Sequence, residues 1–273
     1  MIFIDTSGFQ PSQDWRARAK TLTDGMLTMT DQQRRDLITR HSALWGELKG
    51  DLERLSHCKC WYCERLKVRD DFAVDHFRPK NNVMNEDGTK GQGYWYLAFD
   101  YTNYRVACDW CNTTHTGEGG IALGKQDQFP LDARCARAIY PNCRIENEVP
   151  LLLDPTSVDD PPLLWFIDTG EAVVRPGEGA LQTRRVEVTT KVLHLNHIRI
   201  VEARKEIWRK CKRLIKRADK KLALFNETGS PEARQEYLDF VNEMKEYVKP
   251  TAEFSATARA CFQGSRYYWV NQS

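Results

Sequence analysis

Apolar residues recur at helical spacing near both ends of the chain and change to short, interrupted runs in the middle. Between residues 13 and 57 the spacing predicts two or three helices, with Asp31 as an N-cap. Residues 71–77, "DFAVDHF", predict a short strand, and the stretch "NNVMNEDGTKGQG" at 81–93 predicts a loop rich in Gly and Asn. The first third of the chain therefore runs from helices into an irregular, strand-containing segment.

The second half of the chain has the reverse order. Between 145 and 174, apolar runs broken by proline and the turn Asp168-Thr169-Gly170 predict short strands or a hairpin. From about residue 183 the pattern is helical again, with one long helix over about 198–226 and a second over 231–248. Ser230 is the predicted N-cap of the second helix, and Lys249-Pro250 ends it before another short helix.

This order of elements predicts an α+β protein with four regions. They are an N-terminal helical region (1–56), a segment with two cysteine pairs (57–135), a Pro-rich strand and loop extension (136–182) and a C-terminal helical region (183–273). The chain has 273 residues, of which 41% are hydrophobic, so it can bury a substantial core. No apolar run approaches the roughly 18 to 20 residues of a membrane span, and the first residues do not resemble a signal peptide. We therefore expect a cytoplasmic protein without a membrane partner.

Charge is distributed unevenly, although the formal net charge is only +2. Residues 199–221 contain eleven Lys or Arg and three acids, whereas residues 145–171 contain seven acids and neither Lys nor Arg. The basic helix has three interpretations: it contacts a nucleic-acid backbone, it binds a protein partner, or it is a solvated face. In the last case the inward residues are Ile200, Ile207, Trp208, Cys211 and Ile215.

Two Cys-x-x-Cys pairs carry the clearest chemical signal. Cys60 and Cys63 form the first pair, and Cys108 and Cys111 form the second. Between Cys63 and Cys108 lie 44 residues. Four thiolates from two tight turns suit a tetrahedral structural Zn²⁺ site, which has no open position for catalysis. Cys58 is an alternative to Cys60 at the metal, and buried or redox-active cysteines are the alternative to a metal site. Trp61 and Trp110 lie inside the two pairs and are expected to cover the metal.

The segment between the pairs resembles the HNH nucleases, the ββα-metal family. The residues that carry the resemblance are "VDH" at 74–76, Asn103 in "YTNYRVAC" and Asn112 in "CDWCN". The resemblance implies a zinc-stapled ββα-metal finger over 57–135, with Asn112 at the opening of its helix and the long helices on either side. It implies that His76 is the general base, that Asp75 and Asn112 hold a catalytic Mg²⁺ or Mn²⁺, and that Asn103 ties the loop and orients His76.

Two further residues near the second cysteine pair extend this interpretation. His115 is expected on the same helical face as Asn112, where it joins the ion, contacts phosphate or is simply solvated. The family pattern includes a lysine soon after Cys-Asn, and the nearest candidate, Lys125, follows an insertion. Asp75 and His76 are neighbours on a strand, so the strand has to end or twist at this point for both to face one ion.

A wider resemblance covers about residues 57–207. "HFRPK", "KQDQFPL", "EVPLLLDPTSVDDP" and "LHLNHIRIVEARKEI" resemble the HNH proteins of Septu-type and retron-associated anti-phage systems. This resemblance implies a DNA endonuclease that works with an ABC-like ATPase partner. The alternatives are a zinc-stabilised adaptor that binds nucleic acid or protein without catalysis, and an HNH-type RNase or tRNA nuclease.

Overall fold

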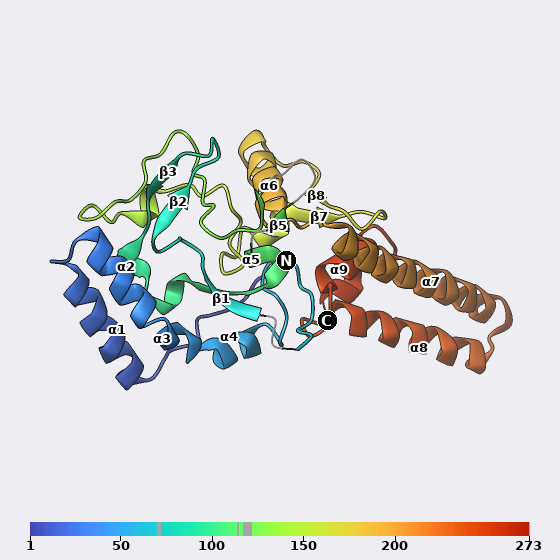
Figure 1. Cartoon of the computed structure of the whole chain (residues 1–273). Coiled ribbons are helices and arrows are strands. Elements are labelled where there is room, and N and C mark those ends of the chain that lie inside the picture. The colour runs from blue at the N-terminus through green and yellow to red at the C-terminus, as the bar shows by residue number, and fades with distance from the viewer. Residues whose placement is uncertain (70–71, 114, 117–121, 273) are drawn as a thin grey trace.

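The computed structural model of the chain describes residues 1–69, 72–113, 115–116 and 122–272. Helices and short strands alternate along it, so the fold is mixed α and β (Figure 1). The helices are α1 (Gln13–Met26), α2 (Asp31–Arg40), α3 (Ala43–Gly46), α4 (Lys49–Leu55), α5 (Asp109–Asn112), α6 (Ala180–Val192), α7 (Ile198–Thr228), α8 (Pro231–Val248) and α9 (Ser255–Gln263). The strands are β1 (Phe72–His76), β2 (Asn82–Met84), β3 (Lys90–Gln92), β4 (Tyr104–Cys108), β5 (His115–Thr116), β6 (Ala122–Leu123), β7 (Leu164–Phe166) and β8 (Ala172–Val174).

The N-terminal region contains the four helices α1 to α4 where the sequence predicted two or three. The prediction of Asp31 as an N-cap is wrong by one residue, because Thr30 caps α2. The Gln33 amide N–H donates to the Thr30 hydroxyl at 3.4 Å, and the Thr30 N–H donates to Gln33 Oε1 at 2.8 Å. This reciprocal pair satisfies two amide groups that a helix start leaves without partners.

The β1–β4 pair lies near the middle of the molecule (Figure 1). The strands run antiparallel, with Asp75 opposite Arg105 and His76 opposite Tyr104, and every residue of β4 is buried. The helix that follows is short: the expectation that Asn112 opens a helix is wrong, because α5 ends at Asn112 and Thr113 adopts extended dihedral angles. His115 therefore lies in strand β5 and not on a shared helical face with Asn112.

The segment predicted as a loop at 81–93 contains the β2–β3 hairpin. Gly88 in its turn has φ +81°, a conformation that glycine adopts without steric cost. A second hairpin, β7–β8, confirms the prediction made from Asp168-Thr169-Gly170. Gly170 has φ +88° and packs directly on α7, where an added Cβ would lie 2.1 Å from the Val201 carbonyl oxygen.

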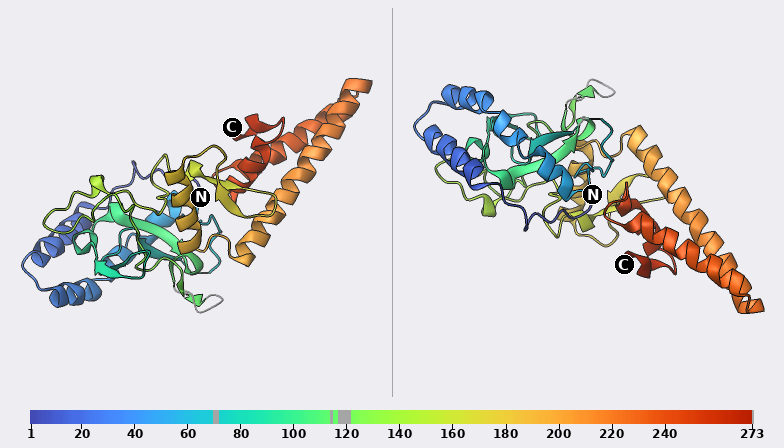
Figure 2. Two further views of the ribbon diagram at one scale, coloured as in Figure 1. Left: turned by 90° about the horizontal axis from the view of Figure 1, so that it is seen from above. Right: turned by 90° about the horizontal axis from the view of Figure 1, so that it is seen from below.

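The long helix α7 and its partner α8 form an antiparallel arm that projects from the body of the molecule (Figure 2). Gly229 ends α7 in the left-handed conformation with φ 69°, and Ser230 caps α8 as predicted, its hydroxyl accepting from the Ala233 N–H at 3.1 Å. Ile200 and Cys211 are buried, and the other predicted inward residues are partly buried against the cores. None of the helices in the described part of the chain is long and apolar enough to span a membrane.

One hydrophobic core joins residues from all four predicted regions. It contains Trp15 from the first region, Trp61 from the second, Leu153 from the third and Ile200 and Phe254 from the fourth. The predicted boundaries therefore mark changes in sequence pattern within a shared core, and the division into domains stays a prediction.

Candidate metal centre and catalytic cavity

The four cysteines of the two pairs lie together in the core. Cys60 and Cys63 come from the turns before β1, Cys108 ends β4, and Cys111 lies in α5. Their Sγ atoms all lie within 4.8 Å of one another, and the Sγ atoms of Cys63 and Cys108 are 3.7 Å apart. Four buried thiolates in this arrangement could hold a structural metal ion such as zinc in a closed site. Among the residues that the structure describes, no other group of three or more His, Cys, Asp or Glu side chains converges in this way.

The structure distinguishes Cys58 from Cys60 as the candidate metal ligand. Cys58 is exposed and lies outside the cluster, whereas Cys60 is buried within it. The Cys108 N–H donates to Cys60 Sγ at 3.4 Å, a contact that favours the thiolate form. The choice of Cys60 over Cys58 is therefore confirmed as far as the geometry of the cluster is concerned.

The two tryptophans inside the pairs have different surroundings. Trp61 is buried in the shared core, and the Trp110 ring stacks on His197 with ring centroids 4.2 Å apart. His197 caps α7, its side chain accepting from the Arg199 N–H at 3.3 Å. The stacked rings therefore connect the second cysteine pair to the start of the long helix, and the covering of a metal by these rings stays a prediction.

Arg204 is a residue that the sequence analysis missed. It belongs to the basic helix but is only 1% exposed, and its Nη1 donates to the Leu195 carbonyl at 2.8 Å. Its Nε and Nη2 atoms are buried without a hydrogen-bond partner. Burial lowers the pKa of its guanidinium, and negative charge on the cysteines of the cluster and on Glu64 acts in the opposite direction. The guanidinium thus lies in the electrostatic field of both the cysteine cluster and Glu64.

Two side chains hold Asp75 at the end of β1, and neither contact was predicted from the sequence. The Tyr62 hydroxyl donates to Asp75 Oδ2 at 2.7 Å, and Lys125 Nζ donates to Oδ1 at 2.9 Å. Lys125 is fully buried and also donates to the His76 carbonyl oxygen at 2.7 Å. The lysine after the insertion therefore does reach the Asp75-His76 pair, and its ammonium balances the charge of the buried carboxylate.

The orientation of the His76 ring defines its tautomer. Nε2 lies 2.9 Å from the Ala98 carbonyl oxygen, which only accepts, so Nε2 carries the proton and Nδ1 the lone pair in the neutral ring. Lys80 Nζ lies 3.5 Å from Nδ1. Burial lowers the pKa of the His76 imidazole well below its usual value, and the charge of Lys80 lowers it further. The ring is consequently neutral at physiological pH, with a basic nitrogen available.

Asn103 ties the backbone that follows His76. Its Oδ1 accepts from the Arg78 N–H at 2.8 Å, and its Nδ2 donates to the Arg78 carbonyl at 2.9 Å. The two bonds fix the chain two residues after His76, immediately before Pro79. The resemblance implied that Asn103 ties the loop and orients His76, and this role stays a prediction.

Asp75, His76 and Asn112 line the same cavity, of about 310 Å³, which we call the histidine cavity. Two neighbours on a strand can both face it because β1 ends at His76, as the alternation of strand side chains required. The rest of its lining is formed by Val74, Pro79, Lys80, Thr113, Gln126 and Asp127. The side chain of His115 lies outside the described residues, so the structure does not place it in this cavity.

The lining of the histidine cavity is compatible with a hard divalent cation. Each oxygen of Asp75 receives one donor and has a second lone pair, and Asn112 contributes an amide. Such oxygen ligands suit Mg²⁺ or Mn²⁺ better than softer metals. Asp127, at the exposed rim of the cavity, was not predicted; it stands in the quoted segment "KQDQFPL", so a signal for it was present.

The fold and site together define a protein with a closed four-cysteine centre next to a cavity lined by an acid, an imidazole and an amide. No family model matches the chain. The chain is 31% identical over 164 residues to Septu protein PtuB from Bacillus mycoides (strain KBAB4), and the match covers 59% of this chain and 50% of that protein. The chain therefore spans about half the length of the curated relative that it matches.

This similarity confirms the predicted relationship to a Septu component. It does not test the HNH assignment, nor the retron-associated part of the resemblance, and both stay predictions.

Proposed function

We propose that this protein is a metal-dependent endonuclease of the HNH type that hydrolyses phosphodiester bonds in DNA. The observation that supports the proposal is the convergence of Asp75, His76 and Asn112 on one cavity next to the cysteine cluster. A carboxylate and an amide supply hard oxygen ligands, and a neutral imidazole supplies a base. An adaptor without catalysis would need none of these three groups to share a cavity.

In this proposal His76 is the general base. The bond from Nε2 to the Ala98 carbonyl fixes the ring, so that Nδ1 receives the proton of the attacking water. The lowered pKa keeps Nδ1 unprotonated at neutral pH. Asn103 is a positioning residue, because its two bonds to Arg78 hold the backbone on which His76 is mounted.

Asp75 and Asn112 hold the catalytic Mg²⁺ or Mn²⁺ in the proposed site. When bound, the ion supplies charge neutralisation at the phosphate and at the leaving oxygen. Lys125 pairs with the same carboxylate as the ion and weakens the negative potential there. An ion held by Asp75 and Asn112 would use phosphate oxygens of the substrate as further ligands, so metal binding would be coupled to substrate binding.

The similarity to Septu protein PtuB supports a role for this endonuclease in anti-phage defence. We propose that it acts there with an ABC-like ATPase, and that helical regions outside residues 57–135 bind this partner. Co-purification of the chain with an ATPase encoded beside it tests this part. Isolation as an unaccompanied and constitutively active monomer would contradict it.

The experiment for the proposed activity is cleavage of plasmid DNA by the full chain, alone and with its ATPase partner, with and without added Mg²⁺ or Mn²⁺. His76→Ala is expected to lose activity by about 10²- to 10⁴-fold, the usual contribution of a general base. The matched control is His41→Ala, which removes an exposed imidazole at the end of α2. The zinc content of both variants should match the wild type, and a cooperative thermal transition is the check that His76→Ala is folded, since truncation of this buried ring is expected to lower its stability.

Equal activity, or equal protection of cells, for His76→Ala and the wild type would favour the adaptor. Parallel digestion of DNA, total RNA and tRNA distinguishes a DNase from an RNase, since the same arrangement of side chains can act on either backbone.

A further inference from the structure

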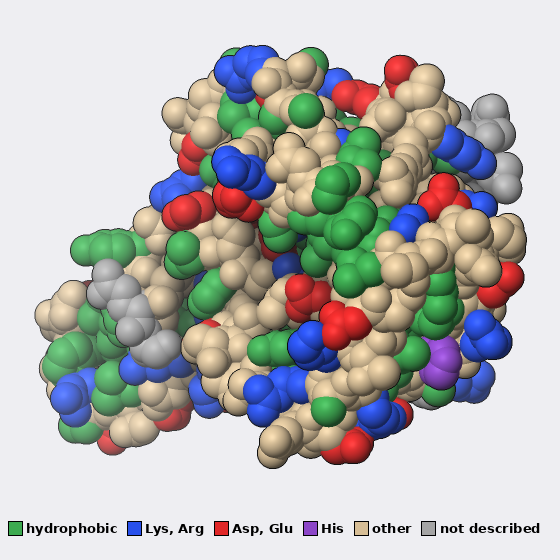
Figure 3. Space-filling model, turned by 90° about the vertical axis from the view of Figure 1, so that its left-hand side faces the viewer, with side chains coloured by type: hydrophobic (Ala, Val, Ile, Leu, Met, Phe, Trp, Pro, Cys, Tyr) green, Lys and Arg blue, Asp and Glu red, His purple; other side chains and the backbone are tan. Residues whose placement is uncertain are grey.

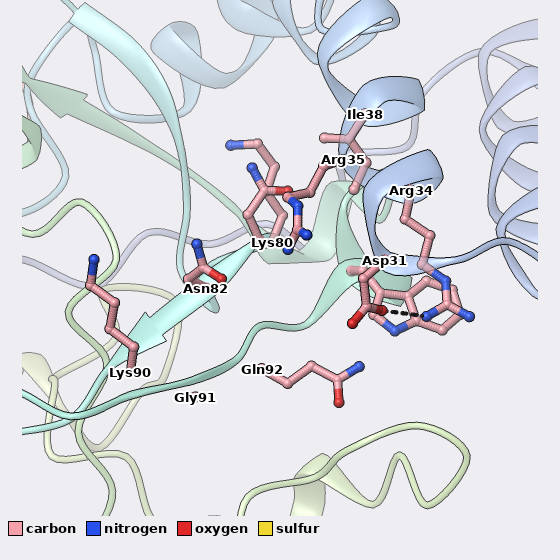
Figure 4. Close-up of a pocket in the computed structure, with 11 residues that line it drawn as sticks. Asp31, Arg34, Arg35, Ile38, Lys80, Asn82, Lys90, Gly91 and Gln92 are labelled. Carbon is pink, nitrogen blue, oxygen red and sulfur yellow. Dashed lines mark hydrogen bonds and ion pairs between the residues drawn. The ribbon is translucent and has the colours of Figure 1, made fainter.

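A second cavity, lined by cations, lies between α2 and the β2–β3 hairpin (Figure 4). Its volume is about 320 Å³. Its charged lining consists of Arg34 and Arg35 from α2, Lys80, Lys90 from β3 and one carboxylate, Asp31. We call it the basic cavity. The side of the molecule that carries α1 and α2 is hollowed near its centre, with charged side chains around the hollow (Figure 3).

The single carboxylate of the basic cavity is already engaged. Asp31 Oδ1 lies 3.0 Å from Arg34 Nη1, and the Arg34 guanidinium lies 4.1 Å from the centroid of the Trp95 ring. Within the described part of the chain, Arg35 forms no ion pair with a carboxylate, and Lys90 acts on the Asp127 carboxylate through its charge without an ion pair to it. Cations gathered around one cavity repel one another, and this repulsion is relieved when an anion binds among them.

Trp95 forms part of the wall of the basic cavity. Trp95 is 4% exposed, and its indole Nε1 is buried without a hydrogen-bond partner. Arg35 contributes a fork of N–H donors and Lys90 an ammonium group, and both geometries suit phosphate oxygens. The lining therefore favours a phosphate-bearing ligand.

The basic cavity and the histidine cavity share one lining side chain. Lys80 lines both of them. Lys90 also lines a third cavity, of about 280 Å³, which shares Gln126 and Asp127 with the histidine cavity. An extended polyanion could therefore contact the basic cavity and the Asp75-His76 pair at the same time.

We propose that the basic cavity binds a backbone phosphate of the nucleic-acid strand whose scissile phosphodiester lies in the histidine cavity. The proposal rests on the proposed function, because that function places a phosphodiester next to His76. Lys80, between the two cavities, contacts the segment of strand that joins the two phosphates. Arg35 and Lys90 set the path of the strand between α2 and β3.

The test measures binding of a labelled oligonucleotide by fluorescence anisotropy, with the full chain in a His76→Ala background that prevents cleavage. Arg35→Gln and Lys90→Gln each remove one charge from the basic cavity. Arg40→Gln is the matched control, because Arg40 is exposed on the same helix and does not line the cavity. DNA and RNA of one sequence are compared, and polyglutamate is added as a competitor.

Each of the two cavity variants is expected to bind about eightfold more weakly than the control near 0.1 M salt, and to reduce the slope of log K against log salt by about one. The loss should be equal across oligonucleotide sequences, since a phosphate contact carries no sequence information. Equal affinity and slope for Arg35→Gln, Lys90→Gln and Arg40→Gln would overturn the proposal. Polyglutamate binding with the same dependence on Arg35 would assign the cavity to an acidic protein and also overturn it.

Different results would contradict the endonuclease proposal and the proposal that the basic cavity binds the strand. If the wild type binds DNA through Arg35 and Lys90 but does not cleave it with Mg²⁺, Mn²⁺ or the ATPase partner, the strand site stands and the endonuclease proposal fails. If plasmid cleavage is observed and neither variant changes binding or the Michaelis constant, the endonuclease stands and the strand site fails.

Discussion

The cysteine cluster and the histidine cavity are built from the same short elements but differ in every property that matters for chemistry. Cys108 ends β4 and Asn112 ends α5, so one short segment of chain supplies both centres. The cluster is closed and buried, with four soft sulfur ligands, whereas the cavity is open and contains oxygen and nitrogen ligands. The cysteine cluster can therefore fix the backbone, while the histidine cavity remains accessible to a substrate.

The balance of charge separates the two centres as well. Arg204 is the buried cation next to the cysteine cluster and has two nitrogen atoms without partners. Lys125 is the buried cation next to Asp75. Its two hydrogen bonds go to Asp75 and to the His76 carbonyl oxygen, both at the end of β1. The first cation therefore has two nitrogen atoms without partners beside the cysteines, whereas the second directs two of its three N–H donors to Asp75 and to the His76 carbonyl.

The largest expected effect comes from breaking the cysteine cluster. Cys108→Ser removes one of four ligands, and structural zinc contributes on the order of 10 kcal/mol of apparent binding energy in small peptides. We expect loss of bound zinc together with loss of cooperative thermal unfolding of the residues around β1 and β4. Metal analysis and calorimetry measure the two quantities. Cys58→Ser is the control, and loss of zinc in that variant would contradict the cluster of Cys60, Cys63, Cys108 and Cys111.

The second effect concerns Arg204 and the zinc affinity of the cysteine cluster. Arg204→Met keeps an unbranched side chain in the core but removes the charge and donors next to the thiolates. We expect the zinc affinity to fall by about 10- to 100-fold, as for other groups that support metal ligands, without loss of the fold. Competition with a chelating dye measures the affinity. Arg209→Met, at an exposed position of the same helix, should leave it unchanged; equal affinity for both variants would show that Arg204 only fills space.

The smallest effect concerns the dependence of stability on pH. The pKa of His76 is lowered in the folded state, so below about pH 6.5 the unfolded chain binds a proton that the folded chain does not. Protonation of His76 therefore does not change the free energy of unfolding above that pH, and lowers it by up to about 1.4 kcal/mol per pH unit as the pH falls further. His76→Gln should lose this part of the slope between pH 6.5 and 5.5 in urea denaturation without added Mg²⁺.

His41→Gln is the matched control for that comparison, because it removes an exposed imidazole. An unchanged slope in His76→Gln would mean that the ring is accessible to protons in the folded state. That result would count against the buried, neutral base on which the proposed mechanism depends.

The sequence predicted the main parts of both centres because their residues stand at short, characteristic spacings. The Cys-x-x-Cys pairs predicted the cluster, and "VDH" with Asn103 and Asn112 predicted residues that the structure brings to one cavity or to its supporting loop. The place of Asn112 at the opening of a helix was predicted wrongly, since α5 begins at Asp109 and the extended dihedral angles of Thr113 end it at Asn112. The functions of these residues stay proposals.

Contacts between segments far apart in the sequence could not be predicted in the same way. Tyr62 and Lys125 meet at Asp75 across separations of 13 and 50 residues, and no local pattern records such a meeting. Arg204 belongs to a helix whose many cations suggested a solvated or nucleic-acid-binding face. Its burial had a weak signal, because it falls four residues after Ile200 and four before Trp208 on the apolar face.

Ligand types, the long C-terminal helices and the β7–β8 turn could be read from the chain, because spacing, capping and turn chemistry act within a few residues. The tertiary structure was needed to show which cations are buried, which imidazole nitrogen lies next to Lys80 and which cavities share a side chain. The physical reason is that desolvation, charge pairing and cavity shape depend on neighbours brought together by packing, and these neighbours lie tens of residues away along the chain.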